Sequence, residues 1–246
     1  MVKKQLPNFI TCLNLVCGCL ALVSVFHKAL DMAAYLIGAA LIFDYLDGTL
    51  ARLLNVKGEF GKQLDSLADV VTFGVVPGFI MYQMLTTSVF ETFGMLSNSD
   101  IKWNIAFIAL LIPVFSALRL AKFNIDTRQS ESFIGVPTPA NTILIASFPL
   151  ILIFEPDSFL APSLHNLIVL ISITIVSSYL LICELPLFSL KFKNFNWKEN
   201  QIRFVFLILS LLLLVIFKYT GLALVIILYV VLSAIRPLIN KVNSIK

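Results

Sequence analysis

The sequence contains little charge and few of the residues that build disulfide-stapled or zinc-binding folds. Only 13% of its 246 residues are charged, and it has four cysteines and two histidines. The cysteines lie inside apolar runs, and no Cys-x-x-Cys pair occurs. This pattern argues against a disulfide framework or a Cys/His zinc site. We expect buried, unreactive thiols at Cys12, Cys17, Cys19 and Cys183.

The chain also lacks a basic stripe interleaved with aromatic residues, a long polar linker and an internal repeat. The first absence argues against nucleic-acid binding, so we interpret the net charge of +4 as a matter of membrane topology and anionic-lipid contact. The other two absences predict a single domain over residues 1–246. The first apolar run has no small-residue cleavage site after it, so we expect it to be retained rather than removed as a signal peptide.

Apolar side chains dominate instead. They make up 59% of the residues, including 21 phenylalanines, and the mean hydropathy is +0.95, which is typical of integral membrane proteins rather than soluble domains. A membrane-spanning helix needs about 20 apolar residues. We therefore predict an all-α, polytopic membrane bundle of about eight transmembrane helices, at residues 8–27, 32–51, 66–88, 103–121, 139–155, 166–187, 203–218 and 221–239.

The positive charges predict the orientation, because Lys and Arg accumulate on the cytoplasmic side of membrane proteins. With the N-terminus inside, fifteen of the eighteen Lys and Arg residues face the cytoplasm, and the exceptions are Lys28, Lys102 and Lys218. We expect both termini to be cytoplasmic and the protein to lie in the cytoplasmic (inner) membrane.

One stretch conflicts with this apolar composition. It runs from residue 44 to residue 69 and reads DYLDGTLARLLNVKGEFGKQLDSLAD. An aspartate in a transmembrane helix costs about 2.5–3.5 kcal/mol on insertion scales. Four aspartates on two adjacent helices should therefore face one polar cavity that holds cations. These aspartates are Asp44, Asp47, Asp65 and Asp69.

Helix periodicity of about 100° per residue gathers these residues on two facing stripes. The stripe on the earlier helix carries Asp44, Asp47, Gly48, Ala51 and Arg52, and the stripe on the later helix carries Gly61, Asp65 and Asp69. The small residues either permit close helix approach or leave room for a flat ligand.

Clustered carboxylates repel one another in a low dielectric unless hard cations neutralise them. Oxygen-only ligands favour Mg²⁺, Mn²⁺ or Ca²⁺ over zinc, and the neighbouring Arg52 suggests an anionic partner such as a phosphate. This combination indicates metal-assisted phosphoryl transfer.

The spacing Asp-x-x-Asp-Gly-x-x-Ala-Arg, eight residues, Gly-x-x-x-Asp-x-x-x-Asp resembles the signature of the CDP-alcohol phosphatidyltransferase family without any departure. The resemblance implies that an alcohol hydroxyl attacks the β-phosphorus of a CDP-linked lipid and that CMP leaves. It implies that two ions, Mg²⁺ or Mn²⁺, bind at Asp44, Asp47, Asp65 and Asp69. In the same resemblance Asp69 is also placed to deprotonate the acceptor. It implies a CDP-lipid pocket lined by Gly48, Ala51, Arg52 and Gly61. A homodimer is expected, as in relatives.

Two further runs bear on the acceptor alcohol. LPNFITCLNLVCG near the N-terminus and RLAKFNIDTRQSESFIGVPTPA from residue 119 look like the bacterial and archaeal phosphatidylserine synthases of this family. The resemblance implies CDP-diacylglycerol and L-serine as substrates. A zwitterionic acceptor suits the polar cluster of the second run, where we expect serine to bind at Arg119, Lys122, Asn124 and Arg128.

Three alternatives stay open at this point. First, Asn8, Thr11 and Asn14 share roughly one helix face, and they hydrogen-bond either the nucleotide or neighbouring helices. We predict the nucleotide contact for Asn8 and Thr11. Phosphatidylglycerophosphate synthesis is the second enzymatic interpretation. A cation transporter is a remote third, because transport predicts carboxylates near the bilayer midplane and related halves.

Overall fold

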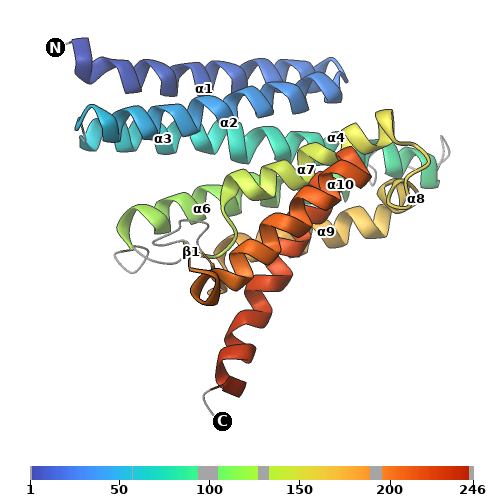
Figure 1. Ribbon diagram of the computed structural model, residues 1–246. Coiled ribbons are helices and arrows are strands. Elements are labelled where there is room, and N and C mark those ends of the chain that lie inside the picture. Colours follow the sequence, from blue (N-terminus) through green and yellow to red (C-terminus); the bar gives the residue numbers. More distant parts are fainter. Residues whose placement is uncertain (1, 57, 94–104, 127–132, 189–195, 244–246) are drawn as a thin grey trace.

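The apolar runs of the sequence form helices, as the computed structural model in Figure 1 shows. The structure describes residues 2–56, 58–93, 105–126, 133–188 and 196–243. In chain order its elements are α1 (Val2–Phe26), α2 (Leu30–Leu53), α3 (Glu59–Val70), the π-helical segment η1 (Val71–Val75), α4 (Val76–Phe93), the 3₁₀ turn η2 (Phe107–Leu110), α6 (Leu111–Ile125), β1 (Phe133–Ile134), α7 (Thr138–Phe154), α8 (Ala161–His165), α9 (Leu167–Ile182), β2 (Pro186–Leu187) and α10 (Trp197–Asn243).

The prediction of an all-α membrane bundle is confirmed, and within the described residues each of the eight expected segments overlaps a helix. Within the described residues, five helices are long and apolar enough to cross a membrane, at Gln5–Phe26, Leu30–Leu53, Glu59–Thr92, Phe107–Ile125 and Asn200–Ile235. The apolar helices α7 and α9 are shorter than a full span. The number of eight spans and the side on which the termini lie therefore stay predictions.

The first three helices pack as neighbouring rods. Helices α1 and α2 form an antiparallel hairpin whose turn is made at Lys28, with φ of 60°. The α3–η1–α4 helix then runs back against this pair (Figure 1). As a result, the start of α1, the end of α2 and the start of α3 lie at the same end of the bundle, which we call the acidic end because it carries the aspartates.

The π-helical segment η1 begins two residues after Asp69. Such segments disturb the regular ladder of helix hydrogen bonds and recur at functional sites. Here the Thr142 hydroxyl on α7 donates to the carbonyl oxygen of Phe73 at 2.8 Å, which gives that buried carbonyl a partner. This bond holds the first turns of α7 beside the segment that follows Asp69.

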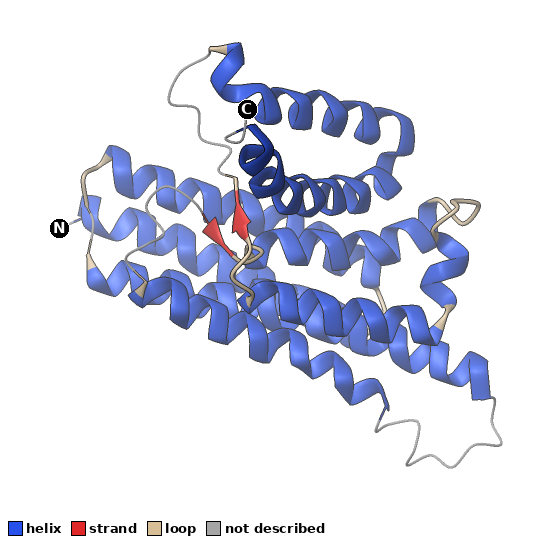
Figure 2. Ribbon diagram, turned by 90° about the horizontal axis from the view of Figure 1, so that it is seen from below, coloured by secondary structure: helices blue, strands red, loops and turns tan. Residues whose placement is uncertain are grey.

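Helix α10 is a hairpin of two arms, because the backbone leaves the helical region at Lys218 (φ 42°, ψ −112°). Figure 2 shows the second arm returning beside the first. Gly221 permits the reversal: a Cβ at that position would lie 2.4 Å from the carbonyl oxygen of Leu213. The sequence placed a turn at Lys218 to Gly221, and the break at Lys218 confirms it.

The only β structure in the described residues is a two-residue antiparallel pair, which the sequence did not predict. Phe133 pairs with Leu187 and Ile134 with Pro186. Gly135 follows with φ of +74°, and a Cβ there would approach the carbonyl oxygen of Leu181 to 2.5 Å. The pair therefore holds the entry to α7 tightly against the end of α9.

Buried apolar side chains from α1, α2, α4, α7 and α9 form the main core, and many large apolar side chains remain exposed on the outer surface. That distribution suits a bundle whose solvent is hydrocarbon. The prediction of buried thiols is wrong for Cys12 and Cys19, which are exposed on the outside of α1, and Cys17 and Cys183 are half-buried. All four thiols are free, as predicted.

Candidate active site

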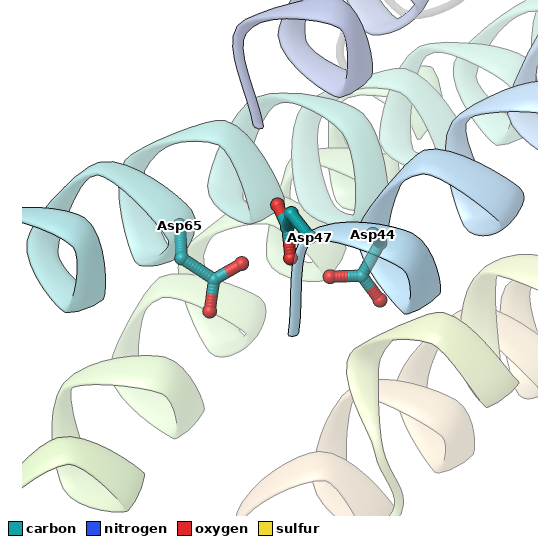
Figure 3. A group of neighbouring side chains, drawn as sticks. All are labelled: Asp44, Asp47 and Asp65. Carbon is teal, nitrogen blue, oxygen red and sulfur yellow. The ribbon is translucent and has the colours of Figure 1, made fainter. Parts of the chain in front are cut away.

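Three aspartates converge at the acidic end. Asp44 and Asp47 come from α2 and Asp65 comes from α3, and Figure 3 shows their carboxylates directed into one shared space. One oxygen from each lies within 4.8 Å of the others. Asp47 is buried and the other two are half-buried. The two helices meet there because the short connection between residues 54 and 58 turns the chain back on itself.

These carboxylates are poorly compensated within the protein. Among the described residues, none of the three forms an ion pair with a Lys, Arg or His side chain, and the buried Oδ1 atom of Asp65 has no hydrogen-bond partner. Buried carboxylate oxygens without partners are costly unless a cation satisfies them. The donor set is all oxygen, which Mg²⁺ and Mn²⁺ prefer. The three residues therefore fit a divalent metal site.

Asp69 lies one helical turn beyond Asp65 on α3 and does not belong to the group of three. Its side chain is 8% exposed, and its Oδ1 accepts a hydrogen bond from Asn14 Nδ2 at 3.3 Å. A metal role for Asp69 stays a prediction.

Helix α1 supports the carboxylates from the side. The Thr11 hydroxyl donates to Asp47 Oδ2 at 2.6 Å, in addition to its contact with the carbonyl oxygen of Pro7. Together with the bond from Asn14 to Asp69, this contact shows that the polar face of α1 bonds neighbouring helices. Thr11 also lines the adjacent cavity, so its predicted nucleotide contact stays a prediction.

A cavity of about 570 Å³ opens beside the aspartates. It brings together most of the positions predicted for the CDP-lipid: Asn8, Thr11, Gly48, Ala51 and Gly61, with Asp47 and Asp65 in its wall. At Gly48 a Cβ would meet no atom within 4 Å, whereas at Gly61 it would lie 3.1 Å from Asn8 Oδ1. Gly48 thus leaves room for a ligand, and Gly61 permits close approach of α1.

Arg52 is the exception among the predicted pocket residues, since it does not line the cavity. Its Nε donates to the carbonyl oxygen of Gly48 at 2.9 Å, and a terminal nitrogen contacts the Thr49 hydroxyl at 3.4 Å. The exposed guanidinium therefore lies along its own helix. A rotation of the side chain would be needed before it could reach a phosphate in the cavity.

Sequence reasoning missed several residues of the cavity wall: Pro7, Val56, Gly58, Glu59 and Lys62. Lys62 is a cation in this wall, and its Nζ donates to the carbonyl oxygen of Asn124 at 2.9 Å. Its place next to Gly61, one helical turn before Asp65, was the available signal. Lys62 lies three residues before Asp65 and seven before Asp69, so helix periodicity places it at the edge of the acidic stripe, where the prediction overlooked it.

The three described residues predicted for serine contact different partners. Arg119 on α6 is 7% exposed, and its NH1 lies 3.4 Å from the Thr138 hydroxyl. Its guanidinium also interacts electrostatically with Asp69 and Tyr229. Lys122 instead lies 3.8 Å from Glu184. Asn124 Nδ2 donates to the Ser66 hydroxyl at 2.8 Å. Arg128 lies outside the described residues. Of the described members, Arg119 is the one that is buried.

The convergence of the signature residues agrees with the comparison to known families. The family model of the CDP-alcohol phosphatidyltransferases matches residues 4–189. The chain belongs to the CDP-alcohol phosphatidyltransferase family. The prediction of an enzyme rather than a cation transporter is thereby confirmed.

Curated members of this family include similar sequences from bacteria and archaea. A CDP-diacylglycerol–serine O-phosphatidyltransferase of Helicobacter pylori is 34% identical over 211 residues, which cover 83% of this chain and 80% of the relative. The Bacillus subtilis protein of the same name is 35% identical over 136 residues, covering 55% of this chain and 70% of the relative. An archaetidylserine synthase of Methanothermobacter thermautotrophicus is 32% identical over 146 residues, covering 58% and 57%.

Proposed function

We propose that this protein transfers the phosphatidyl group of CDP-diacylglycerol to the hydroxyl of L-serine, forming phosphatidylserine and releasing CMP. The observation that carries the proposal is the joint position of Asp44, Asp47 and Asp65 beside a cavity of about 570 Å³. The names of the similar family members support serine as the acceptor. The buried position of Arg119 on α6, a helix that packs on α3 and η1, supports an acceptor site next to the cluster.

The three converging aspartates would hold two divalent cations, either Mg²⁺ or Mn²⁺. Asp69 is a further candidate ligand. Bound there, such ions neutralise the diphosphate and stabilise the negative charge that develops on the leaving phosphate. Thr11 holds the Asp47 carboxylate in one orientation through its 2.6 Å hydrogen bond. Gly48 and Ala51 leave space at the helix surface for the nucleotide, with Asn8, Gly61 and Lys62 in the same wall.

Asp69 is the proposed general base. In the reaction, the serine hydroxyl oxygen forms a bond to the β-phosphorus, the bond from that phosphorus to the CMP oxygen breaks, and the hydroxyl proton passes to Asp69. Asn14 fixes one carboxylate oxygen of Asp69, which leaves the other for the proton. Of the four residues predicted for serine, the position of Arg119 supports a contact with the serine carboxylate.

We further propose that the enzyme lies in the cytoplasmic membrane with its acidic end toward the cytoplasm. The distribution of Lys and Arg along the sequence supports this orientation. A homodimer is proposed on the family resemblance alone, and chemical cross-linking of the purified protein would test it.

The acceptor assay tests the function directly. Purified protein in detergent micelles receives CDP-diacylglycerol, Mn²⁺ or Mg²⁺ and radiolabelled L-serine, and we expect labelled phosphatidylserine with one CMP per lipid formed. Parallel reactions contain labelled glycerol 3-phosphate in place of serine. Incorporation of glycerol 3-phosphate and not of serine would reject the assignment in favour of phosphatidylglycerophosphate synthesis.

A further inference from the structure

Several hydrogen-bond donors near Asp69 are buried and have no partner among the described residues. They are the Nε of Arg119, the amide nitrogen of Asn141 and the hydroxyl of Ser116, whose side chains are 7%, 2% and 0% exposed. A buried donor without an acceptor costs about 1–3 kcal/mol. Three such groups on two packed helices indicate an acceptor that the protein itself does not supply.

The three donors lie on the faces of α6 and α7 that meet η1. Ser116 and Arg119 are one helical turn apart on α6, and Ser116 packs at the position of Gly74, where a Cβ would lie 3.0 Å from its own Cβ. On α7, Asn141 lies one helical turn after Thr138, which contacts Arg119, and directly before Thr142, which bonds Phe73. The contacts of Ser116 with Gly74 and of Thr142 with Phe73 thus place these two helix faces against η1.

The start of α7 adds to the same electrostatic environment. It has Pro137 as its N-cap residue and no side-chain cap. The first turn of a helix carries partial positive charge and favours anions. The unpartnered nitrogens of Arg119 and Asn141 lie at this turn. The helix end and the side chains therefore both favour a negatively charged ligand.

We propose that Asn141 and Ser116, together with Arg119 and the first turn of α7, form the subsite that binds the carboxylate of the acceptor amino acid. This inference rests on the proposed function and extends it to the recognition of the acceptor. Asn141 is a specificity residue in this arrangement, since its amide nitrogen donates to a carboxylate that other alcohols lack. Asp69, which lies two residues before η1, is the group that would take the hydroxyl proton.

The charge of the subsite matches a carboxylate better than a phosphate. Arg119 forms no ion pair with a described residue, so its positive charge is available to a ligand. The charge of Asp69 also acts on this guanidinium. One cation with neutral donors compensates a monoanion, whereas a phosphate dianion would face an excess of negative charge. The subsite therefore favours an amino acid over glycerol 3-phosphate.

A comparison of substrate and analogue tests the proposal. The full-length enzyme is assayed for the KM of L-serine, the KM of CDP-diacylglycerol and the inhibition constant of L-serinamide, which has an uncharged amide in place of the carboxylate. The variants are Asn141→Asp and Asn141→Ala. The control is Ser147→Ala on the same helix, which removes a buried hydroxyl bonded within α7 to the carbonyl oxygen of Leu144.

We expect Asn141→Asp to raise the KM of serine by about tenfold or more, because a hydrogen bond to a charged group is lost and a like charge is added. The KM of CDP-diacylglycerol and the inhibition constant of serinamide should change less than about twofold. Asn141→Ala, which adds no charge, should give a smaller change in the same direction and serves if the Asp variant does not fold. Ser147→Ala should leave all three constants unchanged.

Equal weakening of serine and serinamide by both Asn141 variants would overturn the proposal, because a structural role affects both ligands alike. A rise in the KM of CDP-diacylglycerol would overturn it as well. If the wild-type enzyme releases no CMP on addition of serine, the proposed reaction fails and the subsite with it. A serine-active wild type with unchanged serine preference in both variants would reject the subsite alone.

Discussion

Carboxylates at the two ends of the bundle have opposite surroundings. At the acidic end, Asp44, Asp47 and Asp65 converge without a basic partner among the described residues. At the other end, Glu155 at the end of α7 accepts hydrogen bonds from the backbone nitrogens of Tyr219 and Thr220, at 3.2 and 2.9 Å, and from the Thr220 hydroxyl at 2.6 Å.

The Glu155 carboxylate caps the second arm of α10, whose first backbone nitrogens are freed by the break at Lys218. Its negative charge is satisfied within the fold, so its role is structural. The aspartates have a surplus of negative charge that the fold leaves uncompensated. The comparison shows that the number of partners, rather than the residue type, separates a stabilising carboxylate from one that is reserved for a ligand.

Removing a carboxylate from the cluster should have the largest effect. We expect Asp44→Asn to lower kcat/KM by at least about a thousandfold, since a catalytic metal contributes several kcal/mol to transition-state stabilisation. Any remaining activity should need a higher Mg²⁺ or Mn²⁺ concentration, and a chelator should abolish the wild-type activity. Asp31→Asn, in the first turn of the same helix, is the matched control. Normal activity of Asp44→Asn after chelation would contradict the assignment.

Asp69→Asn should lower kcat by about 10²–10⁴-fold, the usual contribution of a general base. Because Asp69 lies outside the group of three, the affinity for CDP-diacylglycerol should be largely retained, as measured by a binding assay with labelled lipid. Loss of lipid binding together with turnover would indicate that Asp69 acts mainly as a metal ligand.

Thr11→Val removes the hydroxyl that orients Asp47 while keeping the shape of the side chain. Loss of a group that orients a metal ligand typically costs about 10- to 100-fold in metal affinity or activity. We expect a change of that size in the metal concentration for half-maximal activity. Ser24→Ala, on the same helix with a hydroxyl bonded to the carbonyl oxygen of Leu20, should leave this concentration unchanged.

Glu155→Gln should have the smallest effect and should change stability rather than activity. Burial by itself raises the pKa of Glu155, but hydrogen bonds from Thr220 and Tyr219 and attraction to Lys218 outweigh it and lower the pKa below 4.5. A lowered pKa stabilises the folded protein above the unfolded value near 4.5, and this contribution is lost as the pH falls through the folded pKa.

We therefore expect Glu155→Gln to cost about 1 kcal/mol, reduced by solvent screening, at neutral pH. In thermal unfolding, the difference from wild type should shrink as the pH falls below 4.5. Asp157→Asn, in the same loop and exposed, is the matched control. A difference that stays constant down to low pH would show that the charge of Glu155 is not the stabilising feature.

Much of the fold and of the acidic site was predictable from local patterns. Long apolar runs identify helices because a lipid-facing backbone must satisfy its own hydrogen bonds. The spacing of Asp44, Asp47 and Asp65 predicted their convergence, because helix periodicity and a short connection leave the two stripes facing each other. The break at Lys218 was also predicted, from the short turn there. The single-domain prediction stays untested, and the family match ends before α10.

Side-chain directions were less predictable. Arg52 was predicted to line the cavity, yet its side chain bonds its own helix, and Lys62 was not predicted, yet it lines the cavity. Lys122 and Asn124 follow Arg119 closely in sequence but contact Glu184 and Ser66 instead. Long side chains reach more than one neighbour, so their contacts depend on which helix packs against them.

The sequence by itself determined the membrane character of this protein, its helical segments and the spacing of its four aspartates, because hydropathy and helix periodicity act over a few turns of one chain. Only the tertiary structure decided that Asp69 is separate from the group of three and bonded to Asn14. It alone placed the unpartnered donors of Arg119 and Asn141 next to η1. Those positions follow from the packing of α1 and α6 on α3 and of α6 and α7 on η1. Packing between distant segments has no periodic signal in the sequence.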